Sequence, residues 1–462
     1  MNLLFVTSSP PEVCPFLTNE KRPPLGLGSL MSIARRQGHN VFFIDNCLKP
    51  IPFIKNGYLQ KNHIDFVGIY ANTVCYRDSL RMFKEIQNLR ERGVWKGKII
   101  VGGPHTSLAP ESIPDFVDYI VQGEGEKALL KIVNGEAKSR ILKEKRISDL
   151  DSLPFQPYDI FTKLPYHNFC EWMDTKPVFT MNTSRGCSFD CAFCSIGSIW
   201  GKQYTAFGAD RIISEIEFLI KNYGAKGVYF REDNFTLNQQ RVTEFCDKIS
   251  KKAKIKWACE TRVDAICDEK LVKLMSNAGC EAMFLGVESG SQRLLDILNK
   301  NITIEQIEEA ITLCKKYKIK TYCSLLTGAP NETYEDHLMT KKLMEKLKPY
   351  EYAFNVFVGV PYSKLYEEIL KNGAYEYKDD LGFLYLPGFD VKTKYFYGTD
   401  SKRFVDYDFK QRTDFDKKLL MDSNRQQPMH MRLFYYLLSF FPTPIAYDLT
   451  KFLKRINNRI IT

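Results

Sequence analysis

Residues 187–194 read Cys-Ser-Phe-Asp-Cys-Ala-Phe-Cys and follow an apolar run and a turn at Gly186. Three thiolates this close together on one loop can bind three corners of an iron–sulfur cube and leave the fourth iron without a protein ligand. A structural four-cysteine site would need a fourth ligand at matching spacing, and none of the remaining cysteines lies in a second Cys-x-x-Cys pair. The spacing therefore predicts a [4Fe-4S] cluster on Cys187, Cys191 and Cys194 with one open iron.

The composition bounds the size and the class of the protein. A chain of 462 residues with 44% hydrophobic residues has material for two or three cores, so we expect at least two domains. The thirteen cysteines mostly stand singly and no basic leader precedes the first apolar run, which predicts a reduced, cytoplasmic location. The net charge of +10 is modest and no lysine block alternates with aromatics, so we expect no nucleic-acid partner.

The first 140 residues alternate apolar runs with helical patterns. Strands are predicted at 2–7, 40–45, 63–71, 98–103 and 117–121. Helices are predicted between them, at 33–38, 80–92 and 127–133. This alternation predicts an α/β fold with a doubly wound parallel sheet, which binds ligands at the carboxyl ends of its strands.

Glycine-rich loops follow two of these predicted strands. Gly102 and Gly103 precede Pro104 and His105, and Gly123 precedes Glu124. Glycines let a backbone approach a ligand closely, which favours contact with a flat or phosphate-bearing molecule. The alternative is that these glycines only form tight turns.

A second alternation begins after a proline-containing linker, predicted at 141–172. Strands are predicted just before Cys187 and at 227–231, 256–260, 281–285, 320–326 and 352–358, with helices between them. Six strands are too few to close an eight-stranded barrel, so we expect a partial barrel of six βα repeats with its working residues at the carboxyl ends of the strands.

Polar residues stand at the ends of these predicted strands. Acids suit an ammonium group and hydroxyls, and a guanidinium suits a carboxylate, which together favour a zwitterionic, ribose-bearing cofactor. Each residue could instead be a helix cap or part of a surface ion pair. The residues are Glu232, Asp233, Arg262, Glu288 and Ser289.

The Cys-x-x-x-Cys-x-x-Cys motif resembles the signature of the radical S-adenosylmethionine (SAM) enzymes, and the polar strand ends match that family over about residues 178–370. The resemblance implies a [4Fe-4S] cluster and SAM as cofactors, and a partial barrel as the fold. It implies that Glu232 or Asp233 contacts the SAM amino group. Which of the two does so stays open, because the family more usually has two aspartates there.

Further SAM contacts are carried over residue by residue. The resemblance implies that Glu288, next to Ser289, contacts the ribose and that Arg262 faces the SAM carboxylate. It also implies that Phe193, the aromatic residue before the last cysteine, packs beside the adenine.

Residues 1–140 resemble the cobalamin (B12)-binding domain that is fused to one class of radical SAM proteins. The resemblance rests on Pro-Pro-Leu-Gly-Leu-Gly at 23–28 and on the two glycine-rich loops. It implies cobalamin contacts from Gly102, Gly103, His105, Gly123 and Glu124. No Asp-x-His-x-x-Gly follows the first strand, so we expect no histidine below the cobalt.

The predicted domains are residues 1–140, a linker at 141–172, a core at 173–372 and a mostly helical extension at 373–462. The apolar stretch at 433–441 stops at Pro442 and is too short for a spanning helix of about 20 residues. We expect it to close the open side of the barrel or to line the substrate cavity, with contact to a membrane surface as a minority alternative.

Together the resemblances imply a cobalamin-dependent methyltransferase. It would act on an unactivated carbon or a phosphorus centre of a small metabolite and take electrons from a donor such as flavodoxin or ferredoxin. Three alternatives remain: an oxidoreductase or cyclase without net methylation, a radical SAM enzyme whose first domain no longer binds B12, and an iron–sulfur electron carrier.

Overall fold

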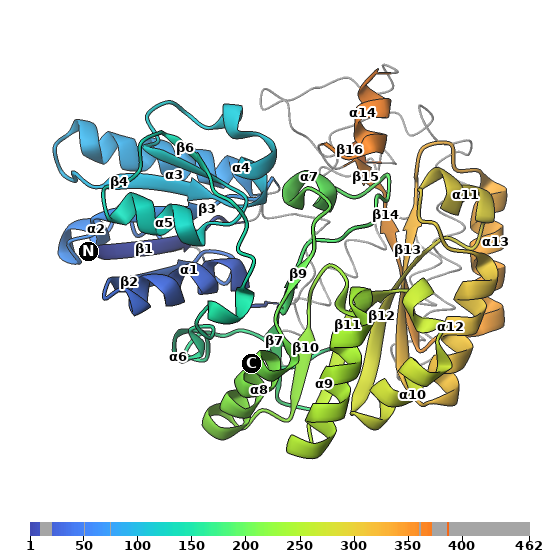
Figure 1. Ribbon diagram of the computed structural model, residues 1–462. Coiled ribbons are helices and arrows are strands. Elements are labelled where there is room, and N and C mark those ends of the chain that lie inside the picture. Colours follow the sequence, from blue (N-terminus) through green and yellow to red (C-terminus); the bar gives the residue numbers. More distant parts are fainter. Residues whose placement is uncertain (10–20, 50, 74, 360–361, 372–385, 388–462) are drawn as a thin grey trace, which may run out of the picture.

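The computed structural model describes residues 1–9, 21–49, 51–73, 75–359, 362–371 and 386–387. They form two large parallel sheets, which Figure 1 shows side by side. Residues 144–177, which we call the connecting segment, lie between them. The predicted helical extension at 373–462, including the apolar stretch at 433–441, lies outside the described residues apart from residues 386–387.

The first sheet has the strand order β2-β1-β3-β4-β5-β6, and all of its pairs are parallel. Its strands are β1 (Asn2–Thr7), β2 (Asn40–Asp45), β3 (Phe66–Tyr70), β4 (Lys98–Gly102), β5 (Tyr119–Gln122) and β6 (Ile141–Lys143). The doubly wound parallel sheet is thereby confirmed. The order reverses between β1 and β3, so the ligand-binding edge of such a sheet lies at their carboxyl ends.

Strand β6 was not predicted, because its three residues lie in a polar segment that reads as linker. Only Leu142 of this edge strand is buried, so the segment carries almost no apolar pattern.

Helices cover both faces of the first sheet. They are α1 (Leu25–Arg36), α2 (Tyr58–Lys61), α3 (Tyr76–Glu91), α4 (Pro104–Leu108) and α5 (Glu126–Val133). Alternate residues of β1 face opposite sides, so Leu4 packs with α3 while Phe5 packs with α1 and α5. Helix α1 begins at Leu25, eight residues before the predicted Ile33, because Gly26 and Gly28 in its first turns hide the helical pattern.

The second sheet confirms the predicted partial barrel. It has six parallel strands in the order β14-β13-β12-β11-β10-β7. They are β7 (Val178–Met181), β10 (Gly227–Phe230), β11 (Lys256–Arg262), β12 (Cys280–Glu288), β13 (Lys320–Thr327) and β14 (Glu351–Val356). The outer layer is α8 (Ala209–Tyr223), α9 (Gln239–Lys252), α10 (Glu269–Asn277), α11 (Gln292–Ile297), α12 (Ile304–Lys316) and α13 (Tyr334–Leu347).

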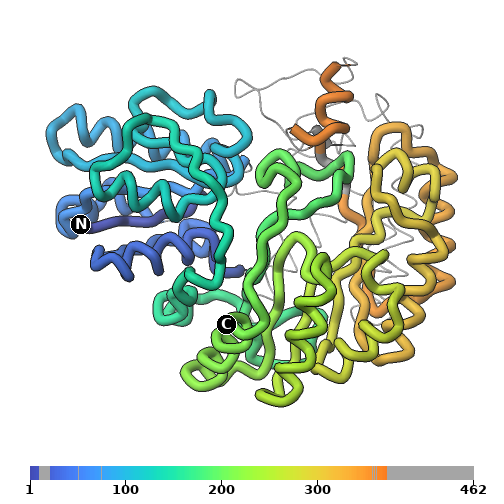
Figure 2. Tube along the Cα trace, in the orientation of Figure 1, coloured from blue at the N-terminus to red at the C-terminus, as the bar shows by residue number. Residues whose placement is uncertain are grey.

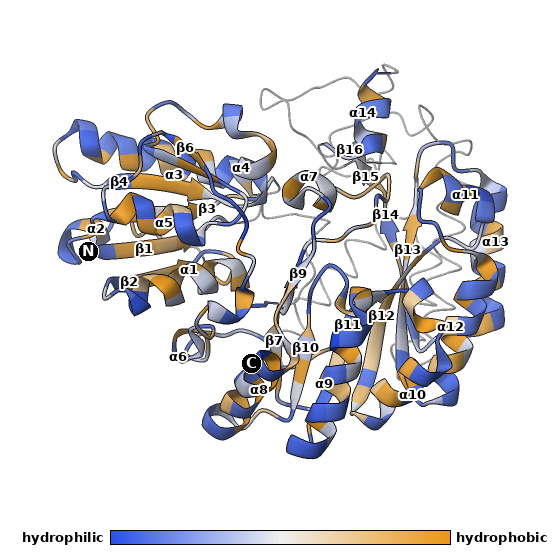
Figure 3. Ribbon diagram, viewed as in Figure 1, coloured by the Kyte–Doolittle hydropathy of each residue, from blue (hydrophilic) through white to orange (hydrophobic). Residues whose placement is uncertain are grey.

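The main core lies between these strands and the outer helices. Val228 and Phe230 of β10 belong to it, whereas Tyr229 between them points into the barrel, toward Trp172, Phe284 and Tyr322. Figure 3 shows the same contrast, with apolar strands behind helices whose outer surfaces are hydrophilic. In the described part of the chain, no helix has the length and apolar character that a bilayer crossing requires.

The connecting segment lies between the two sheets, as the chain trace in Figure 2 shows. It contains α6 (Tyr158–Phe161) and buries Leu150, Leu153 and Tyr158 in the main core of the second sheet. These apolar residues therefore fix the segment against the second sheet. Smaller elements are α7 (Ile196–Trp200), α14 (Lys364–Lys371), β8 (Ser184–Arg185), β9 (Thr205–Ala206), β15 (Val358–Gly359) and β16 (Leu386–Pro387).

Candidate functional site

The loop of the three cysteines leaves the short strand β8, which pairs with β9. Gly186 between β8 and Cys187 has a φ of 84°, and a Cβ there would lie 2.0 Å from the carbonyl oxygen of Gln203. Only glycine fits this turn. Further on, the Ala192 N–H donates to the carbonyl of Leu298 at 2.8 Å, which fixes the middle of the loop against the barrel.

The three thiols lie close enough to influence one another's ionisation. Burial, with smaller contributions from Cys191, Asp233 and Cys187, raises the pKa of Cys194 to about 12, although a backbone hydrogen bond from Ile196 acts in the opposite direction. Thiolates in such a place need bound cations to offset their charge. No group of three or more His, Cys, Asp or Glu in the described ranges converges on a single metal ion. A cube, in which each thiolate binds a different iron, does not require that convergence.

The two adjacent acids after β10 have different surroundings. Glu232 is buried and accepts from the Thr183 N–H at 2.7 Å and from Nη2 of Arg241 at 3.2 Å. Asp233 accepts from the Gly186 N–H at 2.9 Å, beside the cysteine loop. Desolvation by the surrounding protein atoms raises the pKa of the Asp233 carboxyl, so a nearby cation would stabilise its charged form.

Arg262, at the end of β11, lies against the cysteine loop. Its guanidinium stacks 3.7 Å from the centroid of the Phe189 ring, and Nη1 is 3.4 Å from Sγ of Cys191. The Nε donates to Asp264 at 3.0 Å, and Nη2 donates to the carbonyl of Lys300 at 2.6 Å. The structure therefore places Arg262 at the cluster loop with several of its donors already engaged.

Glu288 ends β12 at a bulge and has a φ of 66°, an uncommon conformation for a residue other than glycine. Its carboxylate pairs with Nζ of Lys300 at 2.8 Å, and that ammonium lies 5.8 Å from the ring centroid of Phe193. Glu288, Lys300 and Phe193 thus lie together. The neighbouring Ser289 is buried, with its hydroxyl 3.2 Å from that of Thr340.

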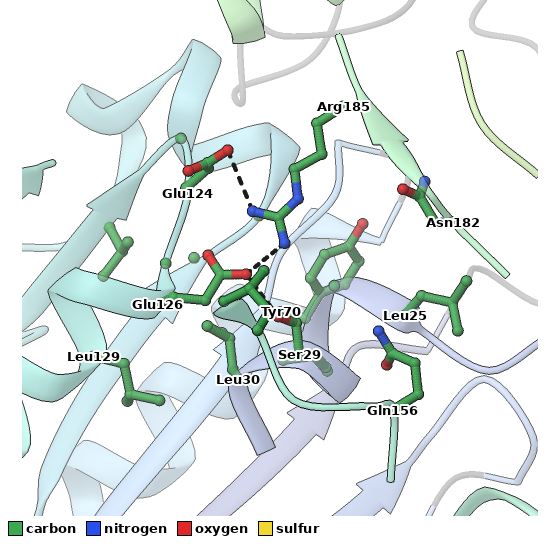
Figure 4. A pocket seen from close by; sticks show the side chains of 18 of the residues that line it. Leu25, Ser29, Leu30, Tyr70, Glu124, Glu126, Leu129, Gln156, Asn182 and Arg185 are labelled. Carbon is green, nitrogen blue, oxygen red and sulfur yellow. Dashed lines mark hydrogen bonds and ion pairs between the residues drawn. The ribbon is translucent and has the colours of Figure 1, made fainter. Parts of the chain in front are cut away.

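A cavity of about 270 Å³ lies between the first sheet and the cysteine loop. Its walls come from the edge of the first sheet, α1, the connecting segment and the residues around β8, several of which Figure 4 shows. The lining residues used below are Gly68, Gly102, Gly103, Gly123, Glu124, Glu126, Gln156, Arg185 and Trp200.

Two features of the cavity wall suit a ligand that approaches the backbone closely and carries amide N–H groups. A Cβ on Gly103, which has a φ of 120°, would lie 2.5 Å from the carbonyl oxygen of Ala71. Glycine is thus required at the bend that opens the wall. Oε1 of Gln156 is buried with no hydrogen-bond partner in the described part of the chain. The carboxamides around a corrin ring carry N–H donors that such an acceptor needs.

His105 does not line this cavity. It is buried, its ring stacks on Tyr76 with centroids 3.8 Å apart, and its nitrogens lie near the hydroxyls of Thr73 and Ser112. Burial lowers the pKa of His105 to about 4, so the ring is neutral.

Glu124, predicted to contact cobalamin, lies in an ion-pair group that the sequence did not reveal. Arg185 reaches Oε1 of Glu124 at 3.2 Å with one nitrogen and Oε1 of Glu126 at 2.6 Å with the other (Figure 4). Only the proximity of Arg185 to the cysteine motif and the repetition in Gly-Glu-Gly-Glu hinted at this role.

The interior of the barrel contains a second group that was not predicted. The Tyr229 hydroxyl donates to the carboxyl of Glu260, and burial raises the pKa of Glu260 to about 7. Arg22, which precedes α1, lies 5.3 Å from the Tyr229 ring centroid and donates to the Thr180 hydroxyl at 3.3 Å. The segment before α1 thus reaches the barrel interior.

Two family models match the chain. The model of the radical SAM superfamily matches residues 181–344, and the model of the B12 binding domain matches residues 19–133. An uncharacterized methyltransferase of Pyrococcus horikoshii is 31% identical over 76% of this chain and 79% of its own length. The anaerobic magnesium-protoporphyrin IX monomethyl ester cyclase of Rubrivivax gelatinosus is 29% identical, with 58% of this chain matching 53% of that protein.

Solved structures share the fold. The methyltransferase TsrM from Kitasatospora setae, with cobalamin and a [4Fe-4S] cluster bound, has a TM-score of 0.63 at 17% identity over 81% of this chain and 75% of its own. The enzyme OxsB, with aqua-cobalamin and SAM bound, has a TM-score of 0.69 at 18% identity over 99% and 71%. At these identities the likeness concerns the fold.

Proposed function

Since this chain belongs to the radical SAM enzymes that carry a B12-binding domain, we propose that it is a methyltransferase for an unactivated carbon or a phosphorus centre of a small metabolite. Its family gives it a [4Fe-4S] cluster, SAM and cobalamin as cofactors and requires a reductant. An iron–sulfur electron carrier is thereby set aside.

The observation that carries the proposal is the cavity between the two sheets. Its wall combines Gly102 and Gly103 from the first sheet with Arg185 and Trp200, which flank the cysteine loop. A methyl carrier in this cavity would face the place where the radical forms. When bound, the cluster and SAM supply a 5'-deoxyadenosyl radical, and cobalamin supplies the methyl group.

The protein's own residues would hold these groups. We propose that Cys187, Cys191 and Cys194 bind the cluster and that Asp233, rather than Glu232, accepts from the SAM ammonium. The support is that Thr183 and Arg241 already donate hydrogen bonds to the Glu232 carboxylate, whereas Asp233 faces the cysteine loop. Glu288 is proposed for the ribose, with Lys300 beside it as its ion-pair partner at 2.8 Å.

The substrate would bind inside the barrel, below the cysteine loop. Phe284 and Tyr322 stack there at 5.1 Å, and the Tyr229–Glu260 pair and Arg22 lie beside the aromatic layer. Aromatic walls with few polar groups exclude water, which protects a carbon radical from side reactions. The polar groups would orient the substrate.

The rival function is a radical cyclization or oxidation without net methylation. One relative is a cyclase, and that protein is nearly as similar in identity as the methyltransferase, although the match spans only 53% of its length. The two reactions differ in how SAM is consumed, because a methylation uses one SAM for the radical and a second for the methyl group.

The experiment is anaerobic turnover with SAM whose methyl group carries three deuteriums, a reductant and a metabolite extract. We expect 5'-deoxyadenosine and S-adenosylhomocysteine in comparable amounts, and an extract component heavier by the labelled methyl group. The control is protein reconstituted without cobalamin. Accumulation of 5'-deoxyadenosine alone, with cobalamin bound, would favour the cyclase or oxidoreductase. Failure to bind cobalamin would contradict both cobalamin-dependent functions.

A further inference from the structure

A buried group of charges joins the first sheet to the cysteine loop. Arg185 of β8 pairs with Glu124 and with Glu126, which lie in the loop after β5 and at the start of α5. The side chains of both glutamates are at most 5% exposed, and that of Arg185 is 16% exposed. We call these three residues the Glu124–Arg185–Glu126 network (Figure 4).

The network is held in place from both sides. From α1 of the first sheet, the Ser29 hydroxyl donates to Glu126 at 2.7 Å, and from the connecting segment the Ile147 N–H donates to Glu124 at 2.6 Å. On the other side, Arg146 donates to the carbonyl of Arg185 at 2.9 Å and stacks 5.2 Å from the ring centroid of Trp200. Trp200 ends α7, the helix that follows the last cysteine of the loop.

The charges of the network are balanced once Arg146 is included, because two carboxylates face two guanidiniums. Burial alone would raise the pKa of Glu126, but Arg185 and Ser29 outweigh burial and leave this pKa below its ordinary value. A buried pair of this kind contributes geometry more than net stability, since desolvation offsets much of its attraction. Nη2 of Arg185 makes a hydrogen bond to Glu126 at 2.6 Å, whereas its contact with Oε1 of Glu124 at 3.2 Å is an ion pair without hydrogen-bond geometry. The planar guanidinium therefore fixes the direction of Glu126 and the distance of Glu124.

We propose that Arg185 is a positioning residue that sets the distance between the cobalamin cavity and the iron–sulfur cluster. It is two residues before Cys187, and both of its partners line the cavity. A shift of the glutamate loop therefore moves the cavity wall and β8 together. This inference rests on the proposed function, because it assigns the coupling of methyl carrier and radical source to one side chain.

The test is the magnetic interaction between cob(II)alamin and the reduced cluster in the holoenzyme, measured by pulsed electron paramagnetic resonance. The test variant is the double substitution Arg185→Met with Glu126→Gln, which keeps the buried charges balanced because Glu124 remains with Arg146. A second variant, Arg185→Lys, keeps the charge and loses the fork. Iron and cobalamin content serve as checks that both variants fold.

The matched control is Arg35→Met, which removes the pair of Arg35 with Asp159 at 2.8 Å. That pair also joins the first sheet's helices to the connecting segment, but its side chains are 45% and 49% exposed. We expect the wild type and this control to show one narrow distance distribution, and the two network variants to show a shifted or broadened one.

An unchanged distribution in the double variant would overturn the positioning role. If the wild type holds no cobalamin, the proposed function fails, and hydrogen exchange of the cluster-loaded protein decides the inference instead. The double variant should then exchange at least ten-fold faster at residues 123–126 and 184–194 than the wild type. Equal exchange there would overturn the inference independently of cobalamin.

Discussion

The two six-stranded parallel sheets of this chain present opposite chemistry at the carboxyl ends of their strands. The first sheet offers mainly backbone, since Gly102, Gly103 and Gly123 stand where its strands end and the nearby Glu124 and Glu126 are already paired with Arg185. The second offers charge, with Asp233 after β10 and Glu288 at the end of β12. A bare edge admits a wide, flat ligand, whereas a charged edge selects a small ligand by its ionic groups. The same architecture thus serves two cofactors.

The largest expected effect comes from changing the cysteine loop, because it should remove the function of the second sheet and spare that of the first. Replacing Cys187, Cys191 and Cys194 together with alanine should abolish cluster iron and SAM cleavage, because no other cysteines have this spacing. Cobalamin binding by the first sheet should persist. Iron analysis, chromatography of 5'-deoxyadenosine and the visible spectrum of bound cobalamin check this. Retained iron or SAM cleavage would contradict the assignment of these cysteines.

A bulky side chain at the glycine-rich edge of the first sheet should weaken cobalamin binding and spare the cluster. At Gly102 a Cβ would meet only Val121, at 3.7 Å, so a larger residue is tolerated by the backbone and extends into the cavity. Gly102→Leu should weaken hydroxocobalamin binding by at least ten-fold, about 1.4 kcal/mol, and leave cluster iron unchanged. Gly102→Ala is the control with a small side chain at the same position, and it should bind cobalamin nearly as the wild type does. Equal binding by both variants would place the corrin elsewhere.

Within the charged edge, the two neighbouring acids should behave differently. Asp233→Asn should weaken SAM binding by roughly 10- to 100-fold, about 1.5 to 3 kcal/mol for a lost charge-assisted hydrogen bond. Glu232→Gln should chiefly lower the melting temperature, because it leaves Arg241 without its buried carboxylate. Isothermal titration and thermal melts separate the two effects. A reversed pattern would assign the ammonium contact to Glu232.

The last prediction concerns the pH dependence of stability and lies in the barrel interior. Because the pKa of Glu260 is raised from 4.5 to about 7, the folded chain keeps a proton that the unfolded chain has lost between these values. Glu260 therefore lowers stability as pH rises from 4.5 to 7, by about 3 kcal/mol at most, and this loss stays constant above pH 7. Tyr229, Arg231, Glu232 and Asp233 all act on this carboxyl.

The variant Glu260→Gln tests this pH dependence. It should melt a few degrees higher relative to the wild type at pH 8 than at pH 5, because glutamine cannot ionise. Differential scanning fluorimetry at both pH values measures the difference. A variant that tracks the wild type at both would mean that Glu260 is ionised at ordinary pH.

The sequence was enough for the features that depend on local pattern. Clear apolar runs such as 2–7 and 40–45 appear as strands with the predicted bounds, and the cysteine spacing and the strand-end residues led to the family. A short edge strand such as β6 was missed, because one buried residue in three leaves no period to detect.

Features that depend on distant contacts were out of reach of local pattern. Arg185 and Glu126 are 59 positions apart, and nothing in either neighbourhood names the other as a partner. The same holds for Glu232. Its sequence neighbours do not reveal that Thr183, 49 positions earlier, donates a hydrogen bond to its carboxylate. The predicted place of His105 near the cobalamin stays a prediction, and local pattern did not reveal that its ring packs on Tyr76.

The docking of the connecting segment has a consequence for biosynthesis. Ile33 of α1, together with Leu150, Leu153 and Tyr158, belongs to the core that α8 and β10 complete, so the ribosome exposes these residues before their partners exist. The nascent first half is then a finished sheet with an uncovered apolar face, a natural target for chaperones until residue 230 has emerged. Ribosome-bound chains that end at residue 210, in which 147–158 has left the ribosome and α8 has not, should be cleaved by protease within 147–158 much faster than chains that reach residue 347.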